Sequence, residues 1–461
     1  MDFNLDPIIG ISTPSGKGGI SVIRLSGTNL ISIVKKVCNF KNSNTLKNRY
    51  ATYLDFIESD GSIIDKGIII YFKSPNSFTG EDVLELHGHG GPIVVKMIMK
   101  RCLEVGKEIG LRIANPGEFS YRAFYNNKID LAQAEAVSDL IEADSEIAAK
   151  LAVKSLTGMF SKEIKKIVGD LINVRIILES NIDFPDDEIE FLEYEQIKNS
   201  LNQIRNSMNL LIRKSKKGSV LREGLKIALV GRPNVGKSSL LNLLSDEKLA
   251  IVTPHAGTTR DKIQNSIYIN GLLVNLIDTA GINTNQNINE IEKIGISITW
   301  EVINEADLVL YLFDSVIGKT KVDKEIIEKV KQKKEILYIW NKIDLTSLDS
   351  KVEKHLDETH IYISIFKNLG LNLLINSIEK KLDFCIADET LYLARQRHLE
   401  ELKEALGHVN LASSKFNDSV IFYELIAEEL RLAQNSLNKI TGEFTSDDLL
   451  GEIFKNFCIG K

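Results

Sequence analysis

Residues 231–238 of this 461-residue chain have the sequence GRPNVGKS and match the phosphate-binding pattern G-x-x-x-x-G-K-[ST]. The apolar run 226–230 precedes them and predicts a buried strand, and residues 239–244 predict the start of a helix. Backbone N–H groups in such a glycine-rich loop, together with the positive end of the helix, bind phosphate oxygens. The motif therefore predicts a nucleotide site in which Lys237 contacts the β- and γ-phosphates and Ser238 binds Mg²⁺.

Two further motifs predict that the nucleotide carries guanine. Residues 341–344 have the sequence NKID and follow a predicted strand. Asp344 can accept hydrogen bonds from guanine N1 and from the exocyclic amine, and adenine offers no such pair. Ser364 ends the last predicted strand, where a backbone N–H can meet guanine O6.

Residues 278–281 are DTAG, so Asp278 can hold the water shell of Mg²⁺ and the glycine N–H can contact the γ-phosphate.

The hydrolysis step is less clearly marked in the sequence. Residues 257–261, GTTRD, provide a threonine that can close over Mg²⁺. Ras-like enzymes orient the attacking water with a glutamine just after the Asp-x-x-Gly motif, but Ile282 stands there and cannot do so. Glu290 and Glu292 are the nearby carboxylates. Asn234 can bring its side-chain carbonyl to a monovalent cation beside the nucleotide, or it can be a structural turn residue.

The chain alternates between two kinds of pattern, and this predicts four segments. Residues 1–118 are predicted to be mixed α/β, 119–218 helical, 219–382 alternating strand and helix, and 383–461 helical again. Two helical blocks around one α/β domain indicate a helical domain with an inserted Ras-like P-loop GTPase domain. The two blocks would then pack as one unit in a multidomain fold of α/β plus all-α type. The basic run 213–219 is interpreted as a solvated linker.

The predicted elements follow local apolar patterns. The predicted strands are residues 7–12, 20–25, 67–72 and 82–87 in the first segment and 266–269, 273–277, 307–313, 335–340 and 360–364 in the third. The predicted helices include residues 91–105, 290–304 and 424–439, and a break in the helical pattern is predicted at 183–187. Two glycine-rich turns, at 14–19 and 87–91, either let backbone approach a ligand or simply connect strands.

The composition argues against several classes of protein. The four cysteines, at positions 38, 102, 385 and 458, form no C-x-x-C pair, so we expect neither a zinc ribbon nor a disulfide framework. No stretch reaches the roughly 18 apolar residues of a membrane span. We therefore expect a soluble cytoplasmic protein with no membrane partner. The net charge of −6 does not exclude a nucleic-acid partner, because a basic face can exist within an acidic total.

Several segments together resemble the MnmE (TrmE) family of tRNA-modification GTPases. They are TPSGKGGISVIRLSG at 13–27, FTGEDVLELHGHGG at 78–91, PGEFSYRAFYNNKIDLAQAEAVSDLI at 116–141, ARQRH at 394–398 and FCIGK at 457–461. The GTPase motifs are generic, whereas both termini and the PGEF segment are specific, and the resemblance runs almost end to end. It implies that residues 1–118 form a folate-binding and dimerisation domain.

The resemblance implies a one-carbon donor at this domain. It would be 5-formyl- or 5,10-methylene-tetrahydrofolate, and the residues expected to contact it are Arg24, Glu85, Lys128 and Lys461. Cys458 would lie near the folate and would be a catalytic thiol. Without the resemblance, an incidental terminal cysteine would be the favoured interpretation.

The resemblance also implies a GTPase that depends on K⁺. The K⁺ ligands would be Asn234, Thr253, His255 and Thr258, and the Mg²⁺ ligands would be Ser238 and Thr259. Glu292 would position the attacking water. The residues expected at the GTP are Asn234, Val235, Gly236, Lys237, Ser238, Ser239, Thr253, Pro254, His255, Ala256, Gly257, Thr258, Thr259, Asp278, Thr279, Ala280, Gly281, Asn341, Lys342, Asp344 and Ser364.

The resemblance further implies partners and a reaction. The chain would form a homodimer whose two GTPase domains meet across their nucleotides. With the FAD- and NADH-dependent protein MnmG (GidA), in a heterotetramer or larger complex, it would modify C5 of the wobble uridine, position 34, in certain tRNAs. The added group would be aminomethyl or carboxymethylaminomethyl. Two other hypotheses are a regulatory or ribosome-assembly GTPase, for which we find neither a second GTPase domain nor a KH module, and a folate-dependent one-carbon enzyme carrying a nucleotide domain.

Overall fold

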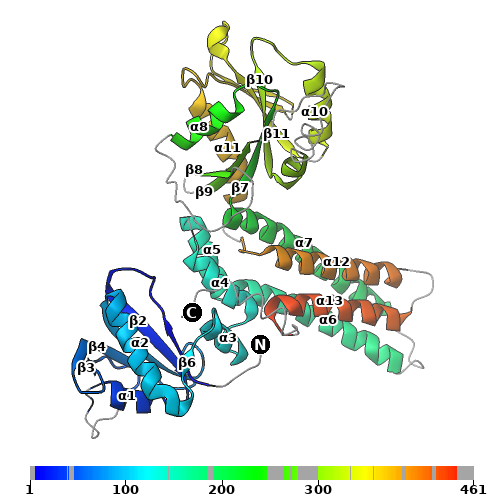
Figure 1. Cartoon of the computed structure of the whole chain (residues 1–461). Coiled ribbons are helices and arrows are strands. Elements are labelled where there is room, and N and C mark those ends of the chain that lie inside the picture. The colour runs from blue at the N-terminus through cyan, green and yellow to red at the C-terminus, as the bar shows by residue number, and fades with distance from the viewer. Residues whose placement is uncertain are drawn as a thin grey trace, which may run out of the picture. The chain divides into compact units, whose positions relative to one another are not determined.

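The computed structural model describes residues 6–38, 40, 46–143, 145–183, 191–246, 264–269, 272–278, 300–332, 334–356, 358–386, 391–417 and 422–443. The chain divides into two compact units. One contains Met1–Ile141, Val153–Asn209 and Glu400–Lys461, and the other contains Glu142–Ala152 and Leu210–Leu399. The first unit holds the N-terminal sheet and a group of long helices, and the second holds another sheet with helices around it (Figure 1).

The first unit begins with a six-stranded sheet in the order β3-β4-β5-β2-β1-β6. Its strands are β1 (Ile8–Ile11), β2 (Gly18–Gly27), β3 (Thr52–Ile57), β4 (Ile63–Phe72), β5 (Asp82–Gly90) and β6 (Arg112–Ile113). Neighbouring strands are antiparallel except β1 and β6, which are parallel. The helices α1 (Ile31–Val37) and α2 (Pro92–Gly106) pack on one face over a core that includes Ile23, Ile69 and Leu84, and a short 3-10 turn, η1 (Lys107–Ile109), follows α2.

The opposite face of this sheet carries charged side chains. Side chains alternate across a strand, so Arg24 on β2 lies on the face opposite the buried Ile23. On β5, Glu85 and His87 alternate in the same way with the buried Leu84 and Leu86. Strand register places Arg24 directly opposite Glu85.

Most of the predicted elements of this domain are confirmed. The four predicted strands correspond to β1, β2, β4 and β5, and the predicted helix 91–105 corresponds to α2. The strands β3 and β6 and the helix α1 were not predicted. Both strands lie at edges of the sheet, and in β3 only Phe56 is buried, so neither has a strong apolar pattern.

Helices follow the sheet, and others come after the second sheet in the sequence. They are α3 (Glu118–Tyr125), α4 (Leu131–Ile141), α5 (Glu146–Leu156), α6 (Met159–Asp183), α7 (Phe191–Glu223), α12 (Gln396–Phe416) and α13 (Tyr423–Thr441). The helices α6 and α13 lie side by side, although the GTPase motifs separate them in sequence (Figure 1). Arg175 on α6 donates a hydrogen bond of 2.7 Å to Gln434 on α13, and Leu171 and Leu430 are fully buried. The helical blocks before and after the GTPase motifs therefore pack together, as predicted.

The interpretation of residues 213–219 as a solvated linker is wrong, because they lie inside α7. Ser215 is fully buried on one side of this helix. At Gly218 the carbonyl oxygen of Tyr392 is so close that a Cβ atom would approach it to 1.9 Å. A run of charges resembles a linker when small side chains form the buried face, because an apolar stripe is then missing. The predicted boundary between residues 218 and 219 thus falls within a continuous helix.

The second unit contains a seven-stranded sheet in the order β12-β13-β11-β10-β7-β9-β8. Its strands are β7 (Leu225–Gly231), β8 (Gln264–Ile269), β9 (Leu272–Asp278), β10 (Leu308–Asp314), β11 (Glu335–Asn341), β12 (Val352–His355) and β13 (Glu358–Tyr362). The five central strands are parallel, and the two edge strands β8 and β12 are antiparallel to their neighbours. The five strands predicted after the phosphate loop are confirmed within a few residues as β8, β9, β10, β11 and β13. The strand predicted before the loop is β7, and β12 was not predicted.

Helices cover both faces of this sheet. The helices α8 (Lys237–Asp246) and α11 (Leu371–Ile386) pack against one face, over residues such as Leu229. The helix α10 (Lys321–Lys331) and helical residues 300–305 pack against the other, over residues such as Tyr311. A short 3-10 turn, η2 (Ile343–Leu345), follows β11. Of the predicted helix 290–304, the part before residue 300 lies outside the described residues.

Parallel strands end at the same edge of a sheet, and this brings the predicted GTPase motifs together. The strands β7, β9, β10 and β11 end at Gly231, Asp278, Asp314 and Asn341.

No helix within the described ranges has both the length and the apolar character that a bilayer crossing requires.

Candidate functional site

The phosphate loop joins the end of β7 to the start of α8 and needs glycine at two positions. Gly231 has φ +153° and Gly236 has φ +104°, conformations that side chains disfavour. A Cβ atom on Gly236 would also lie 2.5 Å from Nδ2 of Asn341. Asn234 adopts the left-handed conformation with φ +64°, which asparagine tolerates better than most residues. The loop is thus curled tightly, as the motif predicts.

Lys237 is buried beneath this loop, with 8% of its surface exposed. Its Nζ donates hydrogen bonds of 3.0 Å to the carbonyl oxygens of Gly231 and Arg232. Burial lowers the pKa of Lys237, and the nearby carboxylate of Asp278 partly opposes that shift. A phosphate group entering the loop would offer this ammonium group oxygens that carry full charge, in place of neutral carbonyls.

The residues at the start of α8 and the end of β9 fit a magnesium ion. The hydroxyl of Ser238 donates a hydrogen bond of 2.7 Å to Oδ2 of Asp278. The other carboxylate oxygen of Asp278 is buried and has no hydrogen-bond partner in the described part of the chain. Mg²⁺ prefers oxygen ligands and retains several waters, so a hydroxyl and a carboxylate with one uncommitted oxygen suit it.

The residues predicted to bind guanine are held in place by side chains from two loops. Asn341 donates from Nδ2 to the carbonyl oxygen of Val235 over 2.8 Å and accepts at Oδ1 from the N–H of Ile365 over 3.1 Å. It thereby ties the phosphate loop to the segment after β13. Ser364 donates its hydroxyl to Oδ1 of Asp344 over 2.5 Å. The predicted guanine-binding residues are therefore brought together with the phosphate loop.

Asp314 belongs to this site and was not predicted. Its Oδ2 lies 2.7 Å from Nζ of Lys342, and its Oδ1 accepts from the N–H of Val316 over 2.9 Å. Burial raises the pKa of Asp314, but these hydrogen bonds outweigh it and hold the pKa below its ordinary value. The register of β10 and β11 pairs Asp314 with Asn341, so an aspartate that ends a fully buried strand was the available signal.

Several predicted site residues lie outside the described residues, so their placement stays a prediction. They are Thr253, Pro254, His255, Ala256, Gly257, Thr258, Thr259, Thr279, Ala280, Gly281, Glu292, Cys458 and Lys461. The described predicted residues near the loop also include Ser239 on α8.

At the N-terminal sheet the structure joins two of the predicted folate residues. Arg24 and Glu85 form an ion pair of 2.9 Å, and the second oxygen of Glu85 lies 3.1 Å from Nε2 of His87. The guanidinium carbon of Arg24 lies 5.8 Å and 5.9 Å from the ring centroids of Phe78 and Phe119. The strands β2 and β5 bring these charges together through their register.

Lys128 is not part of that ion pair. Its Nζ donates to the carbonyl oxygen of Pro75 over 2.9 Å, and within the described residues no hydrogen bond or ion pair links it to Arg24 or Glu85. Of the predicted folate residues, the structure thus joins Arg24 to Glu85 and holds Lys128 in a separate contact.

A buried arginine close by was also missed. Arg122 on α3 is 1% exposed and lies 2.9 Å from both Glu81 and Glu118, and it donates to the carbonyl oxygen of Asp6 over 2.7 Å. Removing one partner of such a buried network costs about 3–5 kcal/mol. Sequence reasoning could have found it only from the presence of Glu81 and Arg122 in the two family-specific segments.

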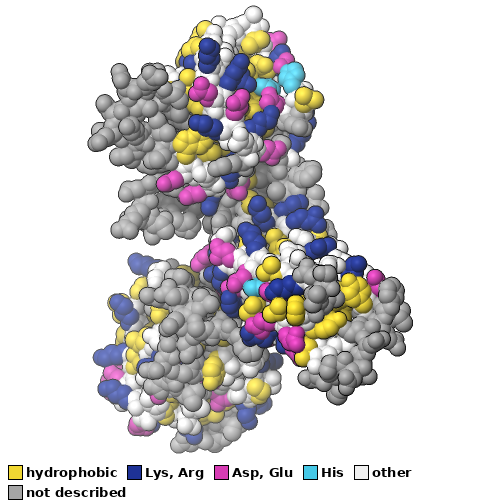
Figure 2. Space-filling view, turned by 90° about the vertical axis from the view of Figure 1, so that its right-hand side faces the viewer, with side chains coloured by type: hydrophobic (Ala, Val, Ile, Leu, Met, Phe, Trp, Pro, Cys, Tyr) yellow, Lys and Arg dark blue, Asp and Glu magenta, His cyan; other side chains and the backbone are white. Residues whose placement is uncertain are grey.

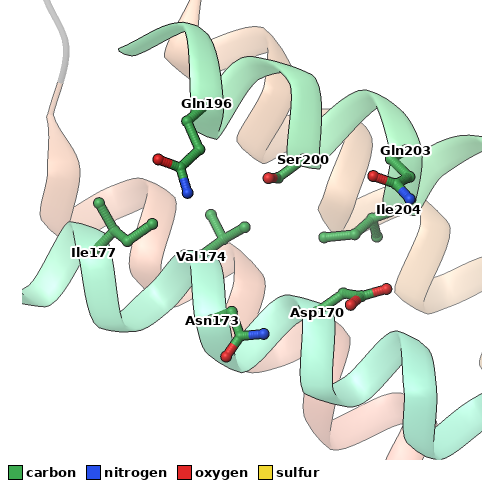
Figure 3. A pocket seen from close by; sticks show the side chains of 8 residues that line it. All are labelled: Asp170, Asn173, Val174, Ile177, Gln196, Ser200, Gln203 and Ile204. Carbon is green, nitrogen blue, oxygen red and sulfur yellow. The ribbon is translucent and has the colours of Figure 1, made fainter. Parts of the chain in front are cut away.

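A cavity lies away from these residues, between α6 and α7 (Figure 3). It has a volume of about 180 Å³. Its lining combines amide, hydroxyl and carboxylate groups with three aliphatic side chains: Asp170, Asn173, Val174, Ile177, Gln196, Ser200, Gln203 and Ile204. It contains no histidine, cysteine or lysine, and we assign it no chemistry.

Comparison with known proteins covers the whole chain. The family model "GTP-binding protein TrmE N-terminus" matches residues 7–128, and the model "MnmE helical domain" matches residues 131–458. A "tRNA modification GTPase MnmE" of Herminiimonas arsenicoxydans is 49% identical and covers 100% of both chains. Proteins of the same name from Bordetella avium and Cupriavidus metallidurans are 46% and 45% identical, and each pairing covers 99% of both chains.

Among solved structures, Era in complex with MgGDPNP and nucleotides of 16S ribosomal RNA is 27% identical over 40% of this chain and 65% of that one, with a TM-score of 0.28. A score this low supports no conclusion by itself. The two family models and the full-length relatives do: the chain belongs to the MnmE family of tRNA modification GTPases.

Proposed function

We propose that this GTPase is activated by K⁺ and works with an FAD-dependent partner of the MnmG (GidA) type. Together they would install an aminomethyl or carboxymethylaminomethyl group on C5 of the wobble uridine, position 34, of certain tRNAs. The one-carbon donor would be 5-formyl- or 5,10-methylene-tetrahydrofolate. The observation that carries the proposal is the 49% identity to a tRNA modification GTPase over the full length of both chains.

The described residues suggest how the chain binds GTP. The curled loop offers backbone N–H groups to the phosphates, and Lys237 exchanges its carbonyl partners for phosphate oxygens. Ser238 would bind Mg²⁺ and Asp278 would hold its water shell, and the ion would supply positive charge beside the phosphate oxygens. Asp344, oriented by Ser364, reads the N1 and amino groups of guanine. Glu292 would position the water that Ile282 cannot hold.

A potassium ion would supply further positive charge beside the phosphates. Asn234 supports this role, because its side chain has no hydrogen-bond partner among the described residues and its carbonyl oxygen is free for a cation. Thr253, His255 and Thr258 would complete the site. In other GTPases an arginine supplies charge at this point and accounts for much of the rate.

The ion pair of the N-terminal sheet supports a folate site within residues 1–118. A carboxylate such as Glu85 can accept hydrogen bonds from the N3–H and 2-amino group of a pterin. Phe78, which flanks Arg24 and is exposed, offers aromatic surface beside it, whereas Phe119 is buried behind Arg24. Lys128 and Lys461 would also contact the folate, and Cys458 would lie near it.

We further propose a homodimer formed through residues 1–118, in which the two GTPase domains meet across their nucleotides and so switch on hydrolysis. The helical domain would be built from residues 119–218 and 383–461, with the GTPase domain 219–382 between them. The complex with the FAD-dependent partner would be a heterotetramer or larger.

Nucleosides from a strain that lacks this gene test the proposal directly. Mass spectrometry of wobble uridine should show loss of the C5 aminomethyl group, and the wild-type chain should restore it. A strain that expresses Lys237→Ala serves as the control for the GTPase step. Unchanged C5 modification in the deletion strain would reject the proposal.

A further inference from the structure

The C-terminal third of α7 carries a concentration of positive charge. Residues 213–222 contain two arginines and three lysines and no acidic residue, in a chain whose net charge is −6. A solvated linker would leave these charges in no fixed arrangement. Because the segment is helical, their directions are set by the helix.

Helical geometry places the uncompensated charges on the side away from the core. Successive residues turn by about 100° around the axis, so Arg213, Lys214 and Lys216 spread over one half of the helix. Ser215 and Gly218 occupy the buried half. We call Arg213, Lys214 and Lys216 the basic face.

No carboxylate in the described part of the chain forms an ion pair with the basic face. Other lysines of the same unit do have such partners, as Lys331 has in Glu358. A further lysine, Lys334, lies near Lys216. Burial lowers the pKa of Lys334, Asp307 opposes the shift, and the positive charge of Lys216 adds to it. Lys216 and Lys334 therefore bring like charges together here, and of the two Lys334 has a carboxylate, that of Asp307, nearby.

A second chain segment covers the buried side of the same stretch of helix. The carbonyl oxygen of Tyr392 packs directly on the backbone of α7 at Gly218, so the segment that leads into α12 crosses α7 there. Lys and Arg side chains gather in Figure 2 at the height where Figure 1 draws the end of α7 and the start of α12.

We propose that the basic face of α7 binds the sugar-phosphate backbone of the tRNA on which this family acts. The proposal rests on the tRNA substrate of the proposed function and names where the tRNA is held. Arginine and lysine contacts to phosphates supply affinity and orientation without sequence specificity. An acidic protein is a poorer fit, because a protein interface needs an apolar centre. Between residues 205 and 222 the described part of the chain exposes one large hydrophobic residue, Leu210.

The test is binding of the full-length protein to a fluorescent, unmodified tRNA transcript, measured by anisotropy over a range of salt concentrations. The variant is R213Q/K214Q/K216Q, and the matched control is K321Q/K324Q/K329Q, which removes three exposed charges from α10. The basic-face variant should bind tRNA about tenfold more weakly, and the slope of log affinity against log salt should fall by about two. R213K/K214R/K216R should bind like the wild type. GTP hydrolysis and melting temperature should be unchanged in all three.

Three outcomes would overturn the proposal. The basic-face variant could bind with wild-type affinity and salt slope, or the control could lose as much affinity as the variant. The variant could also lose wobble-uridine modification in cells while keeping its affinity for tRNA, which would assign the face to a protein partner. None of these three outcomes contradicts the proposed function as long as the wild-type chain restores wobble-uridine modification in the deletion strain. If the wild-type chain does not restore it, the proposed function itself is rejected.

Discussion

The nucleotide site and the N-terminal sheet each present a carboxylate at a polar surface, but they hold it in opposite ways. Asp344 accepts a hydrogen bond from the neutral hydroxyl of Ser364. Glu85 lies between Arg24 and His87, within 3.1 Å of each. The charge of Asp344 is therefore kept for a ligand, while that of Glu85 is largely balanced within the protein.

The two carboxylates therefore require different things of a ligand that binds them. A neutral base that donates two hydrogen bonds can bind Asp344 without displacing a cation. A ligand at Glu85 must either share the carboxylate with Arg24 or take the place of one partner. We expect substitution of Asp344 to have a larger effect than substitution of Glu85, because no second group can replace Asp344.

Asp344→Asn should give the largest effect. The amide loses the charge that accepts hydrogen bonds from guanine N1 and the 2-amino group, so GTP affinity should fall by about a thousandfold. The amide can instead donate to the 2-oxo group of xanthine, so XTP should bind better to the variant than GTP does. Competition against a fluorescent guanine nucleotide measures both. Equal affinity of the wild type and the variant for GTP would contradict the assignment of Asp344.

Hydrolysis should next depend on the cation beside Asn234. GTP turnover should be about a hundredfold faster in K⁺ than in Na⁺, since fixed positive charge at the phosphates stabilises the transition state. Asn234→Ala should remove that difference while leaving nucleotide binding nearly intact. Phosphate release at equal ionic strength is the measurement. Equal rates in the two salts would leave Asn234 as a turn residue only.

Glu85→Gln tests the carboxylate that is already paired within the protein. Loss of its charge leaves Arg24 without a counter-ion, and the affinity for 5-formyltetrahydrofolate should fall about tenfold. GTP hydrolysis should not change. Calorimetric titration of the full-length protein measures the folate affinity. His87→Gln, which preserves the pair of Arg24 and Glu85, is the matched control and should show a smaller loss, and an unaffected Glu85→Gln would remove the folate assignment.

Asp314 should have a modest effect on nucleotide binding. Asp314→Ala releases Lys342 from its ion pair and should weaken GTP binding about tenfold, while Asp314→Asn keeps an acceptor oxygen and should weaken it about threefold. If the asparagine variant is no better than the alanine variant, the side chain only supports the turn that follows β10.

The carboxyl group of Asp314 should also make the stability of the folded protein depend on pH. Its pKa is lower in the folded protein than in the unfolded chain. Its stabilising contribution is therefore complete above the ordinary aspartate pKa of about 3.9 and is lost as the pH falls through the lower folded value. Denaturation below pH about 4 should show this loss in the wild type and not in Asp314→Asn.

Cys458→Ser should give the smallest effect on the GTPase, namely none. If the thiol acts at the folate site, wobble-uridine modification should fall while GTP hydrolysis and its K⁺ dependence stay at wild-type values. Phosphate release and nucleoside mass spectrometry on the same variant make the comparison. A loss of hydrolysis would mean that the C-terminal segment serves a structural role.

Local motifs explain why so much of the nucleotide site could be predicted. Each motif directly follows a strand, and parallel strands deliver their ends to one edge, so Lys237, Asp278 and Asp344 meet whatever lies between them. The pair of Asp314 and Lys342 could not be predicted, because it depends on the register of β10 and β11. The edge strands β3 and β12 escaped prediction because few of their residues are buried.

The sequence by itself determined that the chain is a GTPase of this family and that each nucleotide motif follows a strand. It could do so because phosphate binding needs particular residues at fixed spacing along one stretch of chain. The tertiary structure decided how charges far apart in sequence meet, as Arg24 and Glu85 do on adjacent strands. It also places residues 213–219 inside α7, with the Tyr392 backbone packed on Gly218. Such contacts arise from packing and register, and neither leaves a periodic pattern in the residues that make them.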